Sequence, residues 1–273
     1  MRKLLSANFS RLWKSKVLWI LVLGIIAFCA YSAYQGIGYV QRSSNPVLER
    51  FYFGFVPVTG MLFGLFIRLF TNPDYQEGTL RNKLIVGHSR RDIFLSNFIV
   101  NLAGSFVILA AFLLFGLLES LTIGPFKMEP KWLTYYYLIA FGTVLVFVAV
   151  DTWITSVSTN AGMTALYVGL VWVALIMAAS GLYDRLSEPE MISGFQLLNG
   201  ELVQAPPEPN PMYLSGRTRD ICQFVLDVLP TGQGILMAEV TIEHPVRELI
   251  SSLVLTGAAL AGGILHFSRK DLK

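Results

Sequence analysis

The scarcity of charge is the most informative absence in this sequence of 273 residues. Only 14% of the residues are charged and 54% are hydrophobic, whereas about a quarter are charged in an ordinary soluble domain. So few charges cannot cover the surface of a soluble globule of this length. The composition excludes soluble, disordered and collagen-like chains, and it indicates a polytopic membrane protein. The mild net charge of +3 gives no reason to expect a nucleic-acid partner.

Motifs for catalysis and metal binding are also missing. No lysine follows a glycine, so the chain has no phosphate-binding loop of its own. Its three histidines, His88, His244 and His266, are far apart, and there is neither a His-Glu-x-x-His helix nor a Gly-x-Ser-x-Gly turn. The two cysteines, Cys29 and Cys222, cannot build a disulfide framework. We therefore expect no catalytic residue, no metal site and no cofactor bound by this chain, which by itself is not an enzyme.

Long apolar runs are what the sequence does contain. A membrane-crossing helix needs about 20 mostly apolar residues, and six stretches qualify: 17–34, 51–70, 96–118, 132–157, 161–183 and 249–267. An even number of spans places both termini on one side. Lys and Arg concentrate in the segments on that side, which predicts that both termini are cytoplasmic. A cleaved signal peptide is the less favoured alternative, because the basic segment is long and five further spans follow.

Residues 1–16 have the pattern of an amphipathic helix. Polar residues, Arg11 among them, fall on one face, and the other face is apolar: Leu5, Phe9, Leu12 and Trp13. A basic helix of this kind lies in the membrane interface rather than across it. It serves either as a topology anchor or as a contact for a partner.

The loop 71–95 contains signals for a short helix. Pro73 and Asp74 are expected to end the second span, and Thr79 can cap a short helix that runs to Val86. Gly87 suits the end of that helix. Ser89 and Asp92 form a capping pair at the start of the next one.

One side of this short helix is apolar because of Leu80, Leu84 and Ile85. A simple solvated loop does not need such a side. An apolar short helix of this kind suits a groove on another protein.

Residues 184–248 form a longer loop of different character. It opens with acidic and proline-rich sequence, and a helix at 217–229 carries an apolar stripe that includes Ile221 and Phe224. The run Pro-Thr-Gly-Gln-Gly at 230–234 is expected to end that helix. We interpret the loop as an extracellular cap with an interfacial or partly re-entrant helix, because a disordered linker would leave the stripe exposed. Residues 249–273 are the sixth span and a tail.

Two charges fall inside the predicted spans. Arg68 and Asp151 both lie toward the cytoplasmic ends of their helices, at similar depth. A lone charge in hydrocarbon is costly, so we predict a structural ion pair. A coupling or substrate role and snorkelling of Arg68 are the alternatives.

Together these features resemble a known family. An amphipathic first helix, six spans and a loop that reads Glu77-Gly-Thr-Leu-Arg-Asn-Lys-Leu, followed by Gly87-His-Ser-Arg-Arg-Asp-Ile, are similar to those of ABC-2-type permeases, the membrane subunits of bacterial ABC exporters. The segment Pro230-Thr-Gly-Gln is similar to permeases for peptide or lantibiotic export and immunity. The resemblance covers essentially the whole chain.

The resemblance implies a type V exporter fold in the bacterial cell membrane, with two permease chains above two cytoplasmic ATPase subunits that bind ATP and Mg²⁺. It implies that the elbow helix and the following residues couple to the ATPase: Glu77, Gly78, Thr79, Arg81, Lys83, Arg90 and Arg91. In relatives the second and fifth spans line the path along the dimer axis. The matching path residues here are Phe55, Thr59, Leu62, Val171 and Leu175.

We therefore expect the permease subunit of an ATP-driven exporter that acts as a homodimer or near-identical heterodimer. Its expected substrate is hydrophobic or amphipathic, and antimicrobial or toxic peptides are the first candidates. The main alternative is a non-transporting membrane anchor or sensor that recruits a cytoplasmic partner. A proton-coupled carrier that uses Asp151 and a polytopic membrane enzyme are less favoured, because buried acids and catalytic clusters are scarce.

Overall fold

The chain folds into a bundle of long apolar helices. A computed structural model describes residues 1–42, 47–76, 79–157, 161–198 and 201–269. Within them, six helical segments are long and apolar enough to cross a membrane: Lys16–Gly38, Leu48–Thr71, Arg90–Leu118, Pro130–Val157, Gly162–Ser187 and Pro245–Arg269. The protein is a multi-pass membrane protein, and the predicted all-α class with six transmembrane helices is confirmed.

Most of the helices follow one another along the chain with short connections, and a longer segment with four short strands joins α8 to α9. Their bounds are α1 Arg2–Trp13, α2 Lys16–Arg42, α3 Leu48–Phe53, η1 Val56–Val58, α4 Thr59–Gln76, α5 Thr79–Ile85, α6 Arg90–Ile123, α7 Pro130–Val157, α8 Ala161–Ser187, α9 Gly216–Val228, α10 Pro230–Glu239 and α11 Pro245–Arg269. The second span is made of α3, η1 and α4. It is the most buried, with 67% of its apolar window inside the protein, against 17% for α2, α8 and α11.

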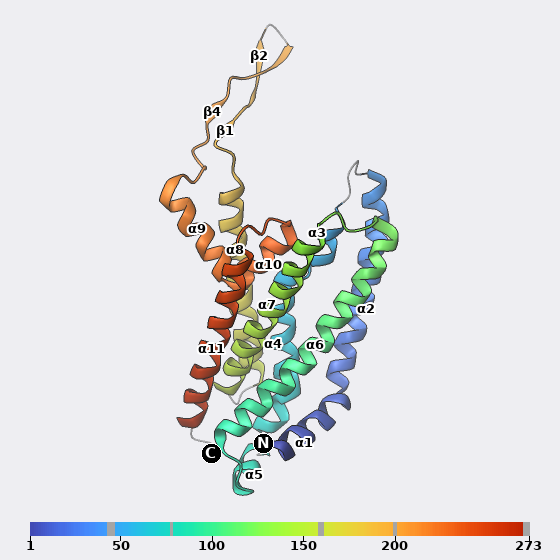
Figure 1. Ribbon diagram of the computed structural model, residues 1–273, viewed down its shortest axis with the longest axis vertical. Helices are drawn as coiled ribbons and strands as arrows, with labels where there is room; N and C mark the ends of the chain where they lie inside the picture. The colour runs from blue at the N-terminus through green and yellow to red at the C-terminus, as the bar shows by residue number, and fades with distance from the viewer. Residues whose placement is uncertain (43–46, 77–78, 158–160, 199–200, 270–273) are drawn as a thin grey trace.

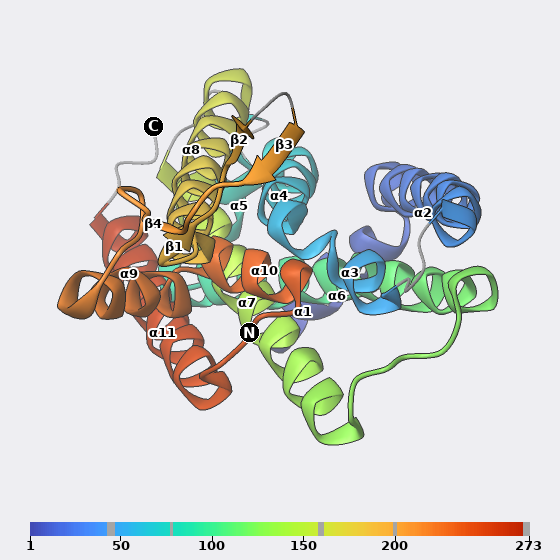
Figure 2. The same ribbon diagram turned by 90° about the horizontal axis from the view of Figure 1, so that it is seen from above.

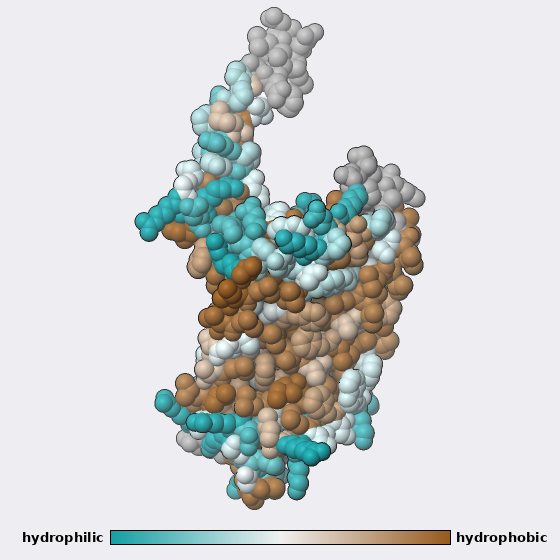
Figure 3. Space-filling model, viewed as in Figure 1, coloured by the Kyte–Doolittle hydropathy of each residue, from teal (hydrophilic) through white to brown (hydrophobic). Residues whose placement is uncertain are grey.

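Both termini lie at the same end of the bundle, which we call the terminal end (Figure 1). Helices α1 and α5 lie at this end, and α3, α9 and α10 lie at the opposite, distal end. A hydrophobic belt separates the two polar ends (Figure 3). This arrangement matches an even number of crossings.

The short helix predicted in the loop 71–95 forms as expected. Helix α5 spans Thr79–Ile85, and Gly87 follows with a positive φ of 94°, a conformation that glycine adopts without strain. Ser89 caps α6, its hydroxyl accepting a hydrogen bond from the Asp92 amide at 3.1 Å. The second membrane-crossing segment ends at Thr71, just before Pro73 and Asp74, but the helix does not break there, because α4 continues to Gln76.

The loop 184–248 is more structured than predicted. Four short strands pair as two antiparallel ladders, β1 Met191–Ile192 with β4 Glu208–Pro209 and β2 Phe195–Leu198 with β3 Glu201–Gln204, in an arm that projects from the distal end (Figure 1). The predicted helix forms as α9 and ends before Pro230. Pro230 then begins a further helix, α10, which the sequence pattern did not predict.

Helices α9 and α10 meet at an angle of 98°, as in a broken span or a re-entrant loop. This supports the partly re-entrant interpretation of the loop. Helix α10 crosses the break in the second span so closely that a Cβ on Gly234 would come within 2.9 Å of the Pro57 Cα atom. Only glycine fits at this crossing.

Candidate functional site

A buried carboxylate joins three elements at the terminal end. Asp74, in the last turn of α4, is 1% exposed. It accepts two hydrogen bonds from Arg11 of α1, Nη1 to Oδ1 at 2.6 Å and Nη2 to Oδ2 at 3.0 Å. Lys83 of α5 donates to Oδ2 at 3.0 Å. The elbow helix, the end of the second span and the short helix are therefore held by one side chain.

Two cations surround this single anion and keep it charged. Burial by itself raises the pKa of Asp74, but hydrogen bonds from Arg11 and Lys83 and their positive charges outweigh that effect and hold the pKa below its ordinary value. The Arg11 guanidinium also lies 4.6 Å from the centre of the Phe70 ring, a cation–π contact. We refer to Arg11, Asp74 and Lys83 as the charge junction.

An apolar cluster and a polar contact support the junction. Side chains from α1, α5, α6 and α11 pack together: Leu4, Leu80, Ile93, Phe94 and Phe267. The Asn8 amide of α1 donates to Ser96 Oγ at 3.0 Å and to Asn97 Oδ1 at 3.3 Å. Buried polar side chains with complete partners fix the register of packed helices.

The face of the elbow helix that packs against the bundle differs from the predicted apolar face by part of a helical turn. The buried line is Leu4, Asn8 and Leu12, while Trp13 is 52% exposed; Leu5 and Phe9 are half-buried. Arg11, predicted on the solvated face, instead bonds to Asp74 in the bundle. The reason is the burial of Asp74, whose charge needs a cation beside it.

The predicted coupling residues occupy different environments. Thr79 begins α5, Lys83 belongs to the charge junction, and Arg90 donates to the Phe267 carbonyl at 3.4 Å. Arg81 and Arg91 are exposed. Glu77 and Gly78 lie outside the described residues, as do 270–273 of the tail.

The tip of α5 exposes two apolar residues that the sequence did not single out together. Ile85 is 73% exposed and Val86 is 77% exposed. Helix α5 lies at the terminal end (Figure 1), between the membrane-crossing segments that end at Thr71 and begin at Arg90.

Arg68 and Asp151 are both buried, and the ion pair between them stays a prediction. Asp151 Oδ1 accepts a hydrogen bond from Trp172 Nε1 of α8 at 2.8 Å, and its Oδ2 has no hydrogen-bond partner within the described chain. Asp151 is level with Gly64, one helical turn from Arg68.

The second and fifth spans pack against each other, and two of the five predicted path residues line one groove of the single chain. Phe55 and Leu62 line an apolar groove, whereas the other three are not in its lining. Thr59 is buried and donates to the Val56 carbonyl at 2.7 Å. Val171 is exposed, and the Leu175 carbonyl accepts from Thr231 at 3.3 Å.

The apolar groove lies between α2, α4 and α6 and has a volume of about 530 Å³. In the view from above, α2 stands apart from α4, with α6 beside it (Figure 2). The lining is almost entirely aliphatic and aromatic and includes Ile25, Met61, Leu62, Ile108 and Phe112. Such a groove suits an apolar chain or ring.

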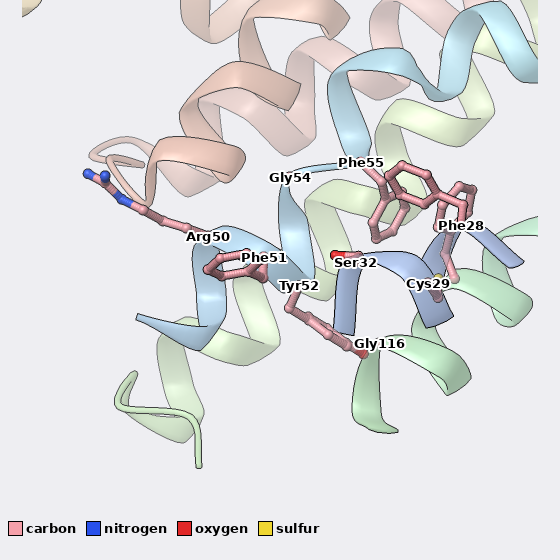
Figure 4. A pocket seen from close by; sticks show the side chains of 10 residues that line it. Phe28, Cys29, Ser32, Arg50, Phe51, Tyr52, Gly54, Phe55 and Gly116 are labelled. Atoms are coloured by element: carbon pink, nitrogen blue, oxygen red, sulfur yellow. The ribbon is translucent and has the colours of Figure 1, made fainter. Parts of the chain in front are cut away.

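A smaller cavity of about 200 Å³ adjoins the groove, and Figure 4 shows the side chains that line it. Phe28, Phe55 and Phe112 line both, and the rings of Phe55 and Phe112 stack with centroids 4.2 Å apart. Arg50 reaches away from the rings (Figure 4), toward Glu239 of α10 at 3.5 Å. The two cavities form one aromatic-lined groove, which we call the lateral groove.

Sequence reasoning missed Asp74 as a site residue because an Asp beside Pro73 is typical of a helix end. Its signal was an acidic residue between two segments that carry basic residues, the elbow helix and the short helix. Asn8 was missed because it lies within an otherwise apolar pattern.

No protein-family model matches the chain, and a comparison with curated proteins finds no match. The family therefore stays a prediction from the residues quoted above.

Proposed function

We propose that this chain is the permease subunit of an ATP-driven exporter of the ABC-2 type in the bacterial cell membrane. It acts with a second permease chain, identical or nearly so, and with two cytoplasmic ATPase subunits. The observation that carries the proposal is the charge junction, in which Asp74 connects the elbow helix and the short helix α5 to the most buried span.

The junction supplies a route for mechanical coupling. An ATPase that binds the apolar tip of α5 displaces Lys83, and Lys83 is bonded to the end of α4 through Asp74. The same α4 carries Met61 and Leu62 in the lateral groove. Movement of α5 therefore changes the shape of the groove. The free energy comes from ATP binding unequally to the two conformations of the complex.

The lateral groove indicates the substrate class. Its lining is apolar and aromatic, so the substrate has a hydrophobic part of comparable size. An amphipathic antimicrobial or toxic peptide fits this description, with lipids and drugs as the next candidates.

The test is co-purification of the chain from its native membranes in mild detergent, followed by an ATPase assay of the eluate. We expect a stoichiometric nucleotide-binding subunit and ATP hydrolysis. The paired variant Ile85→Asp and Val86→Asp should lose both, because charges at the tip oppose apolar docking. The matched control is Leu121→Asp, which alters an equally exposed residue (82%) at the distal end.

Recovery of the folded chain without an ATPase would overturn the proposal and favour the anchor or sensor. Retention of the ATPase by the Ile85 and Val86 variant would show that α5 is not the docking element.

A further inference from the structure

A polar cavity of about 300 Å³ opens at the distal end, away from both sites described above. Helix α9 and the segment leading into α11 provide its lining: Arg219, Asp220, Gln223, Glu243, His244 and Arg247. Cationic and anionic side chains share this cavity. Such a lining suits a ligand that carries both signs of charge.

One buried carboxylate organises half of the lining. Asp227 of α9 is fully buried. Its Oδ2 accepts from Arg247 Nη1 at 2.8 Å and lies 3.2 Å from His244 Nδ1, and its Oδ1 accepts from Gln223 Nε2 at 2.8 Å. Only Nη1 of Arg247 makes a hydrogen bond with the described residues, so the remaining N–H groups of this guanidinium can serve a ligand.

Arg219 provides a second free donor. Its Nη2 donates to the Leu186 carbonyl at 2.8 Å, and its guanidinium lies 5.3 Å from the Tyr213 ring centre. Its Nη1 is buried and has no partner within the described chain. Buried donors are nearly always satisfied, and a phosphate oxygen is a strong acceptor for a guanidinium held in this way.

An apolar groove of about 540 Å³ adjoins this cavity between α9 and α11. Arg247 lines both, and the rest of the groove is mostly apolar: Phe224, Val228, Val246, Ile250, Val254 and Leu255. Val246, Ile250 and Val254 are exposed and spaced four residues apart, so they run about 12 Å along one face of α11. The hydrophilic surface at α9 lies directly above the hydrophobic belt (Figure 3).

We propose that the cavity and the groove together bind one phospholipid of the bilayer, with a phosphoethanolamine headgroup in the cavity and an acyl chain in the groove. The phosphate accepts hydrogen bonds from Arg219 and Arg247, and the ammonium donates to Asp220 and Glu243. Two arginines facing two carboxylates favour a zwitterionic headgroup over an anionic one. A choline headgroup has no N–H to donate to the carboxylates. The site does not depend on the proposed transport function.

The test is native mass spectrometry of the full chain in detergent, titrated with phosphatidylethanolamine, phosphatidylcholine or phosphatidylglycerol of identical acyl chains. We expect phosphatidylethanolamine to bind about tenfold more tightly than the other two. Arg219→Gln should weaken the binding of phosphatidylethanolamine by about the same factor. Arg217→Gln, on the same turn of α9 but outside the cavity, should leave the affinity unchanged.

A second variant tests the acyl-chain groove, and a soluble competitor tests the source of the headgroup. Val254→Trp fills the groove and should weaken phosphatidylethanolamine binding without unfolding the chain. Soluble phosphoethanolamine at the same concentration should not displace the lipid, since it lacks the chain. Displacement by this compound, equal binding of the three lipids, or an unchanged Arg219→Gln would each overturn the proposal. The proposal would also be overturned if the lipid-free chain were a dimer and Val254→Trp dissociated it, because the groove would then hold a second copy of the chain.

Discussion

Asp74 illustrates how one residue can hold several helices. Its pKa is lower in the folded protein than in the unfolded chain, because Arg11 and Lys83 favour the charged form more than burial disfavours it. Deprotonation therefore favours folding. The contribution is complete above the ordinary aspartate pKa of about 3.9 and is lost as the pH falls through the folded value.

We predict that Asp74→Asn lowers the free energy of unfolding in detergent by about 1.5–3 kcal/mol at pH 7, the range for hydrogen bonds to charged groups. The difference from the wild type should stay constant down to about pH 4 and shrink below it. Thermal unfolding from pH 3 to 7 measures it. Asp92→Asn is the control, because the amide rather than the carboxylate of Asp92 makes the capping bond. A pH-independent difference would contradict the role of the charge.

Gly64 lies where α4 packs closely against side chains of neighbouring helices. A Cβ at this position would collide with Val168 of α8 and come within 3.0 Å of Asp151 Oδ1. We predict that Gly64→Val costs about 1–3 kcal/mol, the usual penalty for overpacking. Gly169→Val on the facing helix is the control, since nothing lies within 4 Å of its Cβ position. Equal melting temperatures of the two variants would contradict the close packing of α4 against α8.

At the scale of elements, the bent pair α9–α10 depends on Gln233. Its Nε2 donates to the Asp227 carbonyl at 2.8 Å, the Glu248 carbonyl at 3.1 Å and Ser251 Oγ at 2.9 Å, and its Oε1 accepts from Ser252 at 2.9 Å. One amide therefore satisfies groups on α9 and α11 from its place on α10.

We predict that Gln233→Leu destabilises the protein by about 1–3 kcal/mol, because the buried groups that it serves lose their partner. Faster hydrogen exchange confined to α9, α10 and the first turns of α11 is the expected signature. Thr231→Val removes a single weak bond of 3.3 Å to the Leu175 carbonyl and should change exchange far less. Exchange unchanged in Gln233→Leu would show that apolar packing alone fixes the pair.

Elements also show where sequence patterns succeed and fail. The capping residues Ser89 and Gly87 marked the ends of α5 and α6 correctly, because caps depend on backbone groups within a few residues. Pro73 and Asp74 misled, because a carboxylate in a helix end is stable only if remote cations reach it, and Arg11 is 63 residues away. Helix α10 was missed for a related reason: proline can begin a helix as well as end one.

At the scale of the whole molecule, the structure places both termini at one end, and the charge bias predicts which side that is. We predict that a reporter domain that functions only in the cytoplasm is active when it is fused to either the N-terminus or the C-terminus. A reporter inserted in the distal arm, between β1 and β4, should be active only outside. Opposite behaviour of the two terminal fusions would contradict the even number of crossings.

The sequence by itself determined the membrane class, the six spans and the common side of the termini. These features follow from the composition and from runs of about 20 apolar residues. Each such run can be recognised as a membrane-crossing helix from its own residues alone. The short helix α5 and its caps belong with them.

Only the tertiary structure decided which polar groups meet. Arg11 pairs with Asp74 rather than facing solvent, Asp151 accepts a hydrogen bond from Trp172 of α8, and of the five predicted path residues only Phe55 and Leu62 line the lateral groove. The physical reason is that a buried charge takes the nearest donor that the packing brings to it. That distance depends on the rotation and offset of neighbouring helices, which side chains from several spans set together.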